Sequence, residues 1–308
     1  MEVWGGNQLT AHGVEFGGLD TWVYSKPYQQ AHAGGDIYYA SSCATGRISR
    51  LLLADVAGHG ASVAVTAADL RTLMRRFVNR LDQTEFVQLL NQQFASLSRE
   101  AVFATAIVAT FFEPSRRLTL CNAGHPCPLL YRAAERKWDL LGNLGAGGKA
   151  GPSNLPLGIM NITEYDQFDV ELDSGDCLLS YTDALIESND ADGNELGEEG
   201  LLRIARLLGE LEPQELVETL LNEIAKRYPE NLTDDDVTVM VMRANGRKLD
   251  YSFGEKWGAM LRFGASLIRA IHPAPNGLRS PTPIWQILAG RSFPRSGGAG
   301  VRPVQARS

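Results

Sequence analysis

The sequence has few cysteines and no long hydrophobic run, and these absences exclude several classes of protein. No stretch of about 18 apolar residues is available to span a bilayer. The first residues, MEVWGGNQLT, lack the basic and then apolar pattern of a secretory signal. No Cys-x-x-Cys pair occurs among the four cysteines, which are Cys43, Cys121, Cys127 and Cys177. We therefore expect a cytoplasmic protein whose thiols are small, buried and reduced.

Positive charge is also scarce, except at the C-terminal end. Residues 249–308 contain eight Lys and Arg residues and two acidic ones, a net charge of +6. Because the whole chain has a net charge of −7, residues 1–248 carry −7 − 6 = −13. An acidic main part argues against general binding of nucleic acid. The hydrophobic share of 44% and the charged share of 21% are typical of a soluble globular protein with a core.

The hydrophobic pattern predicts alternating groups of strands and helices in a domain of residues 34–248. The expected strands are 47–56, 103–112, 117–121, 129–131, 138–141, 167–172, 176–181 and 237–243. The expected helices form two pairs, 61–80 with 84–97 and 198–208 with 213–227. In the first helix Val65, Ala68, Leu73 and Phe77 form the expected buried face, and Thr84 is the expected N-cap of the second. This order is typical of packed layers in one domain.

The two ends of the chain differ from this domain. Residues 1–33 read as an N-terminal extension with one or two edge strands that pack on the domain. Residues 249–308 form a basic tail, whose end is rich in Pro, Gly, Ser and Arg and is expected to be disordered. Before that end, a short amphipathic helix is predicted over about residues 255–271. It packs on the domain itself, or docks to a partner, or makes a peripheral contact with an acidic membrane surface.

The stretch 51–59, LLLADVAGH, contains the first candidate functional residue. Its apolar run predicts a buried strand that delivers Asp55 to the edge of a sheet, where Gly58 and Gly60 permit a tight turn. Taken alone, an Asp at a strand end is more often a turn former than a ligand.

Three further carboxylates occupy similar junctions between strand and turn: Asp36, Asp183 and Asp235. Four carboxylates brought to one place repel one another unless cations neutralise them. Oxygen ligands without clustered His or Cys favour Mg²⁺ or Mn²⁺ over zinc. Two such ions about 4 Å apart can share a bridging water, lower its pKa and bind a phosphoryl oxygen. The spacing thus indicates a shared metal site as one of the possible interpretations.

Six motifs occur in order between residues 30 and 243: GGDIYY, ADVAGHG, CNAGHPCPL, LPLGI, GDCLLSYTDALIES and DDDVTVMVMR. The series resembles the bacterial metal-dependent protein phosphatases of the PPM (type 2C) superfamily, in the branch of the sporulation phosphatase and the stress-response sigma-factor regulators. The resemblance implies an α+β fold, a four-layer αββα sandwich of two antiparallel sheets flanked by helices. It also implies direct hydrolysis of phosphoserine or phosphothreonine esters by water activated at two Mn²⁺ or Mg²⁺ ions.

The same resemblance implies roles for individual residues. Asp55 would bridge both metals, and the carbonyl of Val56 would complete one coordination shell. Asp183 and Asp235 would hold the other ion, and Asp36 would bind a metal or a metal-bound water. Within the triplet 234–236 the flanking Asp234 and Asp236 are expected to be solvated neighbours, although a shift of one place stays open.

Two histidines are candidates for other roles near this site. His59 could protonate the leaving alkoxide as a general acid, or it could stabilise the turn. His125 follows Asn122-Ala123-Gly124 and is expected to be structural, with Asn122 and His125 fixing a turn beneath the site.

Two departures from the family pattern bear on activity. Tyr39 stands where the family usually has Asp, and Ala184 replaces the Gly of the usual Thr-Asp-Gly. Neither removes a ligand, but both leave room for weak activity or a partner-dependent switch. The expected function is a serine/threonine protein phosphatase acting on a phosphorylated regulatory protein of the anti-sigma antagonist type, with a possible activating sensor or regulator. The alternative is a PPM-fold binding module that recognises a phosphoprotein without turning it over.

Overall fold

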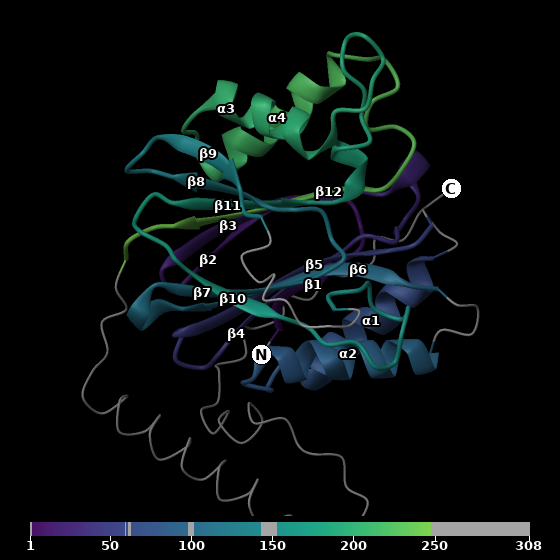
Figure 1. Cartoon of the computed structure of the whole chain (residues 1–308), viewed down its shortest axis with the longest axis vertical. Coiled ribbons are helices and arrows are strands. Elements are labelled where there is room, and N and C mark those ends of the chain that lie inside the picture. The colour runs from purple at the N-terminus through teal and green to yellow at the C-terminus, as the bar shows by residue number, and fades with distance from the viewer. Residues whose placement is uncertain (1, 59, 61–62, 98–101, 143–152, 248–308) are drawn as a thin grey trace, which may run out of the picture. The chain divides into compact units, whose positions relative to one another are not determined.

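The computed structural model describes residues 2–58, 60, 63–97, 102–142 and 153–247, and the fold is given for these residues. Two antiparallel six-stranded sheets lie face to face, and a pair of helices covers the outer face of each (Figure 1). The predicted αββα sandwich is therefore confirmed. His59 and the basic tail with its expected helix lie outside the described residues.

The first sheet contains the strand that carries Asp55. Its strands, in spatial order, are β1 (Glu2–Gly6), β4 (Ile37–Ser42), β5 (Ile48–Val56), β6 (Ala104–Phe112), β7 (Arg117–Ala123) and β10 (Gln167–Glu171). Helices α1 (Ala64–Phe77) and α2 (Gln83–Leu97) cover its outer face (Figure 1). The short helical turn η3 (Glu113–Ser115) joins β6 to β7, as expected for a hairpin.

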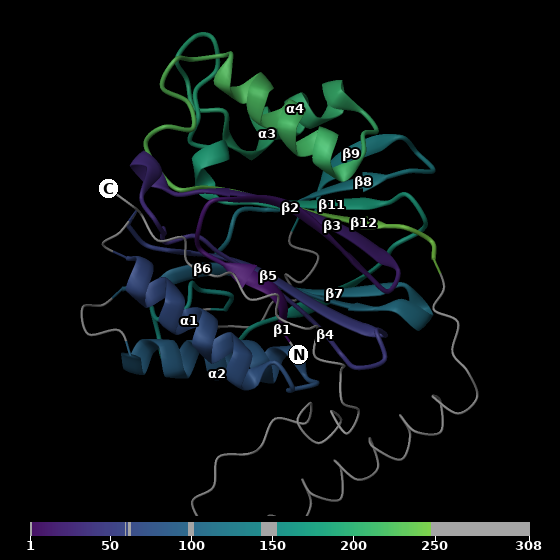
Figure 2. The ribbon, with the colours of Figure 1, turned by 180° about the vertical axis from the view of Figure 1, so that it is seen from behind.

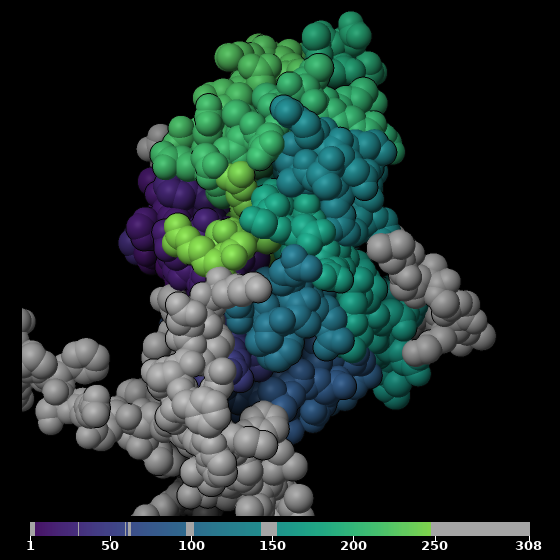
Figure 3. Space-filling view, turned by 90° about the vertical axis from the view of Figure 1, so that its left-hand side faces the viewer, coloured from purple at the N-terminus to yellow at the C-terminus, as the bar shows by residue number. Residues whose placement is uncertain are grey.

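The second sheet contains the strands next to Asp183 and Asp235. Its spatial order is β2 (Thr10–Phe16), β3 (Leu19–Lys26), β12 (Val237–Ala244), β11 (Cys177–Tyr181), β8 (Leu129–Arg132) and β9 (Lys137–Leu140). Helices α3 (Gly197–Leu208) and α4 (Pro213–Ala225) lie over it (Figure 2). In the space-filling view the purple N-terminal strands lie beside the yellow-green end of β12, to which β3 is paired (Figure 3).

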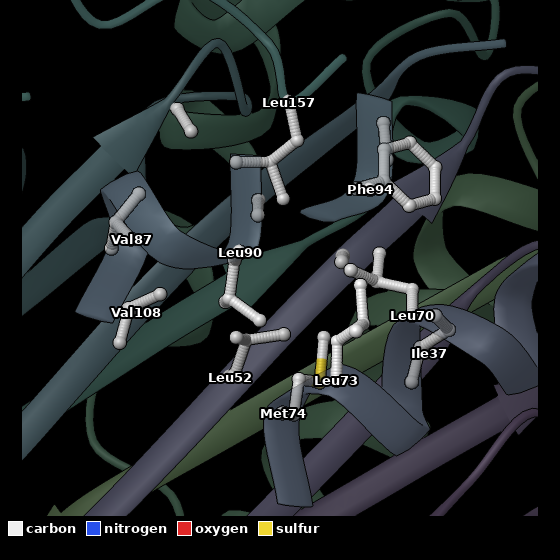
Figure 4. Packing of buried hydrophobic residues seen from close by; sticks show 14 of the residues in the cluster. Ile37, Leu52, Leu70, Leu73, Met74, Val87, Leu90, Phe94, Val108 and Leu157 are labelled. Atoms are coloured by element: carbon white, nitrogen blue, oxygen red, sulfur yellow. The ribbon is translucent and has the colours of Figure 1, made fainter. Parts of the chain in front are cut away.

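The position of β5 between two cores explains why its sequence is continuously apolar and does not alternate between apolar and polar residues. Successive side chains of a strand point to opposite faces of the sheet. Leu51 and Leu53 belong to the core between the two sheets, whereas Leu52 and Ala54 belong to the core beneath α1 and α2. Figure 4 shows Leu52 in this second core, near Leu73 and Met74 of α1. A strand buried on both faces needs apolar residues at every position, so the prediction of a buried strand here is confirmed.

The N-terminal residues contribute more to the sheets than expected. We predicted one or two edge strands, but the structure has three. Strands β1 and β2 lie at sheet edges, whereas β3 lies inside the second sheet between β2 and β12. It pairs with β12 along its full length, from Leu19 opposite Ala244 to Lys26 opposite Val237. This pairing joins segments more than 200 residues apart, and no local pattern in the sequence encodes it.

The first helix pair also corrects two expectations. In α1, Val65 is 71% exposed and Ala68 is exposed, because the helix turns a different face to the sheet. The buried residues are Ala67, Leu70, Leu73 and Met74. Of the predicted face, only Leu73 is among them. Thr84 is not the cap of α2. The side chain of Asp82 accepts a hydrogen bond from the Glu85 backbone N–H at 2.7 Å, as an N-cap residue does.

Gly124 joins two of the sequence motifs in space. Its φ of +69° is accessible to glycine at little cost, and a Cβ atom there would lie 2.5 Å from the Cγ atom of Pro156. The motifs CNAGHPCPL and LPLGI therefore meet at this point, next to β6. There Leu157 forms an isolated β-bridge with Ala104, and Gly124 forms one with Ala106.

The close approach at Gly124 predicts a large loss of stability in Gly124→Ala. The methyl group would collide with Pro156, and an L-residue is disfavoured at this φ. We expect the free energy of unfolding in urea to fall by about 2 kcal/mol or more. Gly142→Ala is the matched control, since among the described residues no atom lies within 4 Å of its added Cβ, and its effect should stay within about 0.5 kcal/mol. Equal stability of the two variants would contradict the contact.

No helix among the described residues has the length and apolar character needed to cross a membrane.

Candidate metal centre

Four of the predicted carboxylates come together at one end of the sandwich, where strands of both sheets begin or end. Asp55 is the penultimate residue of β5, and Asp36 directly precedes β4. Asp183 begins the short helical turn η4 (Asp183–Leu185) after β11, and Asp235 lies two residues before β12. Figure 1 shows the start of α1 and the segment after β11 at this end, on the right.

Asp55 lies at the centre of the group. Its side chain is partly buried, and burial together with the negative charges of Asp183 and Asp235 raises the pKa of its carboxyl to about 8. Asp236 and Glu187 make smaller contributions to the same shift. Carboxylates that oppose one another's ionisation in this way attract cations. The electrostatics therefore place Asp55, Asp183 and Asp235 in one site.

Asp36 is held from behind by the second sheet. It is 3% exposed, and Thr182 Oγ1 donates a hydrogen bond of 2.9 Å to its Oδ2 atom. Thr182 in turn accepts from the Thr238 backbone N–H at 3.0 Å. Burial, then the charge of Asp55, raises the pKa of Asp36 well above its usual range. Asp36 is thus a buried carboxylate fixed next to Asp55 by the hydroxyl of Thr182.

Glu187 is a further acidic residue of this site, and the sequence analysis missed it. It follows Asp183 by four residues, which places both on one side of a helical turn. Its pKa is raised by partial burial and then by the charges of Asp183 and Asp235. In the sequence, the four-residue spacing of Asp183 and Glu187 could have indicated this residue. Glu187 lies beyond the junction of strand and turn, where the other candidate ligands occur.

The Asp triplet before β12 contains three residues in three different environments. Asp234 is exposed, Asp235 is partly buried, and Asp236 is 2% exposed. The expectation that Asp236 is a solvated neighbour is wrong. Its carboxylate accepts hydrogen bonds from the backbone N–H groups of Tyr28, Gly35 and Gly60. Three identical side chains in a row carry no sequence signal that tells them apart.

Val56 ends β5 in a buried position where its carbonyl lies close to the loop that carries Asp36. A Cβ atom on Gly35 would approach the Val56 carbonyl oxygen to 2.9 Å, so only glycine fits there. The carbonyl of Val56 thus lies against the backbone of Gly35, next to Asp36 in the sequence. The two departures are accommodated: Tyr39 is buried in the core beneath α1 and α2, and Ala184 lies in η4 without a positive φ.

His125 has the structural surroundings that we expected. Its backbone N–H donates to Asn122 Oδ1 at 2.7 Å, and Asn122 Nδ2 donates back to its carbonyl at 2.8 Å. The ring Nδ1 lies 2.8 Å from the hydroxyl of Thr105, which pairs with Asp55 across the sheet. Burial lowers the pKa of His125 to about 3, so the ring is neutral at physiological pH.

The donor set suits hard cations. It consists of carboxylates and one carbonyl, the ligands that Mg²⁺ and Mn²⁺ prefer. In the part of the chain that the structure describes, no three His, Cys, Asp or Glu side chains are drawn together tightly enough to hold an ion. Like charges keep such groups apart, and a cation between them would offset that repulsion. Burial and then the neighbouring carboxylates raise the pKa of Asp55, and a bound cation would act in the opposite direction.

Comparison with known proteins identifies the family of the chain. The family model for stage II sporulation protein E (SpoIIE) matches residues 46–245. Stage II sporulation protein E of Priestia megaterium is 22% identical over 229 residues, 73% of this chain and 36% of that protein. Phosphoserine phosphatase RsbU of Bacillus subtilis is 24% identical over 233 residues, 73% of this chain and 63% of that protein.

Solved structures share the fold at low sequence identity. The RsbU and RsbW domains of a Mycobacterium tuberculosis protein align with a TM-score of 0.64 and 23% identity, over 85% of this chain and 72% of that one. The catalytic domain of the serine/threonine phosphatase PstP, in complex with two manganese ions, aligns with a TM-score of 0.52 and 16% identity. The alignment covers 73% of this chain and 97% of that one.

The chain spans between about one third and two thirds of the length of the curated relatives it matches. The family match nevertheless covers well over half of the 308 residues and includes Asp55, Asp183 and Asp235. It therefore confirms the resemblance that the six motifs indicated. The chain belongs to the stage II sporulation protein E family.

Proposed function

We propose that this protein is a Mn²⁺- or Mg²⁺-dependent serine/threonine protein phosphatase. The observation that carries the proposal is the convergence of Asp55, Asp183 and Asp235 from both sheets, where burial and then the charges of Asp183 and Asp235 raise the pKa of Asp55. Family membership supports it, as does a relative that is a phosphoserine phosphatase. We assign the site to residues 34–248, with the tail 249–308 outside it.

Each residue of the site has a defined part in this proposal. Asp55 would bridge two ions, the Val56 carbonyl and Asp36 would complete the site on the first sheet, and Asp183 with Asp235 would bind from the second. Bound Mn²⁺ or Mg²⁺ would supply an activated water and offset negative charge on the phosphoryl oxygens. His59 is retained as the candidate general acid for the leaving alkoxide.

The proposed substrate is a phosphorylated regulatory protein of the anti-sigma antagonist type. Support comes from the relatives, since one solved neighbour carries RsbU and RsbW domains in one chain and another belongs to the bacterial stressosome. We further propose an activating sensor or regulator protein, with no nucleic-acid partner. A cytoplasmic location fits the four free cysteines.

The proposal is tested by hydrolysis of p-nitrophenyl phosphate and of a phosphothreonine peptide, with Mn²⁺ and with a chelator. We expect turnover that requires the metal. A phosphotyrosine peptide of the same sequence is the control for substrate class, and it should be hydrolysed more slowly. Mn²⁺ binding in calorimetry without turnover would indicate a phosphatase that needs its activator. Absence of both would favour the alternative, a PPM-fold module that binds a phosphoprotein without hydrolysing it.

A further inference from the structure

Asp236 makes an unusual set of contacts for a residue next to a candidate ligand. Its Oδ1 atom accepts from the Tyr28 backbone N–H at 2.6 Å. Its Oδ2 atom accepts from Gly35 N–H at 2.7 Å and from Gly60 N–H at 3.1 Å. A carboxylate that is 2% exposed therefore binds three backbone segments that lie between 176 and 208 residues away in sequence.

Two of these three segments carry candidate metal ligands. Gly35 directly precedes Asp36, and Gly60 lies in the turn that follows Asp55 and Val56. Asp236 itself follows Asp235, and its backbone N–H donates to Asp235 Oδ1 at 2.6 Å. One buried carboxylate thus connects the loop of Asp36, the end of β5 and the segment of Asp235.

The surroundings are shaped to this carboxylate. A Cβ atom on Gly34 would lie 2.3 Å from Asp236 Oδ1, so only glycine fits at this position of the loop before Asp36. Gly34 has no positive φ, so glycine is not needed there for its backbone conformation. The requirement at residue 34 is for space, and Asp236 occupies that space.

We propose that Asp236 is a positioning residue, which sets the spacing of the metal-binding donors by holding the Gly35 and Gly60 loops against the segment of Asp235. This inference rests on the proposed function, because it concerns the metal centre of that site. Only a carboxylate provides acceptors on both oxygens for all three N–H groups. In Asp236→Asn one side of the group becomes an N–H₂ donor that faces a backbone donor.

The first test compares Asp236→Asn with Asp234→Asn, which removes the same charge two residues away from an exposed side chain. We expect the Mn²⁺ concentration for half-saturation, in calorimetry and in hydrolysis, to rise about tenfold or more in Asp236→Asn. In Asp234→Asn it should stay within about twofold of the wild type. Circular dichroism and the melting temperature establish that the compared proteins are folded at the assay temperature.

A second variant separates position from charge. Gly34→Ala keeps every carboxylate but places a methyl group on the Asp236 side chain. Positioning predicts weaker Mn²⁺ binding in both Gly34→Ala and Asp236→Asn. If only Asp236→Asn binds the metal more weakly, Asp236 acts through its charge alone and the proposal is overturned.

Amide hydrogen exchange gives a readout that does not depend on phosphatase activity. In the metal-free protein, the N–H groups of Gly35 and Gly60 should exchange about tenfold or more faster in Asp236→Asn than in Asp234→Asn. Strand amides away from the site, such as that of Leu179 in β11, should be unchanged. Unchanged exchange at both glycines would overturn the proposal, even in a protein with full metal-dependent turnover.

Discussion

Replacing Asp55 by Asn is expected to abolish metal-dependent hydrolysis, with kcat/KM lowered about a thousandfold or more. Asp55 lies between both sheets at the centre of the carboxylates, and the charges of Asp183 and Asp235 act on it. The amide keeps the shape of the side chain but removes the negative charge that would bridge two ions. Asp183→Asn should show a loss of similar size, because it removes a charge from the opposite sheet.

The same substitution should not damage the fold. Burial and neighbouring charges make ionised Asp55 unfavourable, so a neutral residue of equal size costs the metal-free protein nothing there. We expect the metal-free Asp55→Asn protein to melt at or above the temperature of the metal-free wild type at pH 8. Mn²⁺ should raise the melting temperature of the wild type and have little effect on the variant.

The comparison with Asp234→Asn controls for the loss of one acidic side chain. This residue is exposed and is not among the charges that raise the pKa of Asp55, so its variant should retain wild-type turnover within about twofold. Full activity of Asp55→Asn or Asp183→Asn at saturating Mn²⁺ would rule out the proposed site.

Without metal, the stability of the protein should fall as the pH rises from 6.5 to 8.5. The folded-state pKa of Asp55, about 8, lies above the ordinary value of 3.8. Its stabilising contribution is complete below about pH 4, where both states are protonated, and is lost as the pH rises through 8. Burial raises the pKa of Asp36 and of Asp183 in the same direction. We expect a loss of about 1 kcal/mol or more in the free energy of unfolding.

His125 limits the pH range in which this effect is isolated. Its folded-state pKa of about 3 lies below the ordinary 6.5, so below pH 6.5 the unfolded chain binds a proton that the folded chain excludes. Below pH 6.5 His125 therefore opposes the carboxylates, whose stabilising contribution still grows as the pH falls toward 4. Urea titrations in a chelator at half-unit steps between pH 6.5 and 8.5 measure the decline in a range where His125 does not contribute.

Both Mn²⁺ and the Asp55→Asn substitution should reduce the loss of stability between pH 6.5 and 8.5. Mn²⁺ binds the deprotonated carboxylates, so it should stabilise the wild type more at pH 8 than at pH 6.5. Asp55→Asn should flatten the decline between pH 6.5 and 8.5. A metal-free wild type that grows more stable over this range would contradict the charge repulsion at the site.

The hydrophobic pattern predicted most of the strands, and the resemblance to the PPM phosphatases supplied the fold class. Residues 51–54 are apolar at every position because β5 is buried on both faces, and this chemistry is visible without a structure. The motif series placed Asp36, Asp55, Asp183 and Asp235 at strand ends, where the structure has them. These inferences succeeded because burial and turn formation depend on residues that are near neighbours in the chain.

Contacts between distant parts of the chain became known only from the folded structure. The register of β3 against β12, the buried face of α1 and the three hydrogen bonds of Asp236 all join segments that the sequence does not mark as partners. Asp234, Asp235 and Asp236 are chemically identical, so their different burial can arise only from what the fold packs against each one. The sequence predicted the candidate donors, whereas the packing of the two sheets decided that Asp236 is the buried member of the triplet and accepts hydrogen bonds from Gly35 and Gly60.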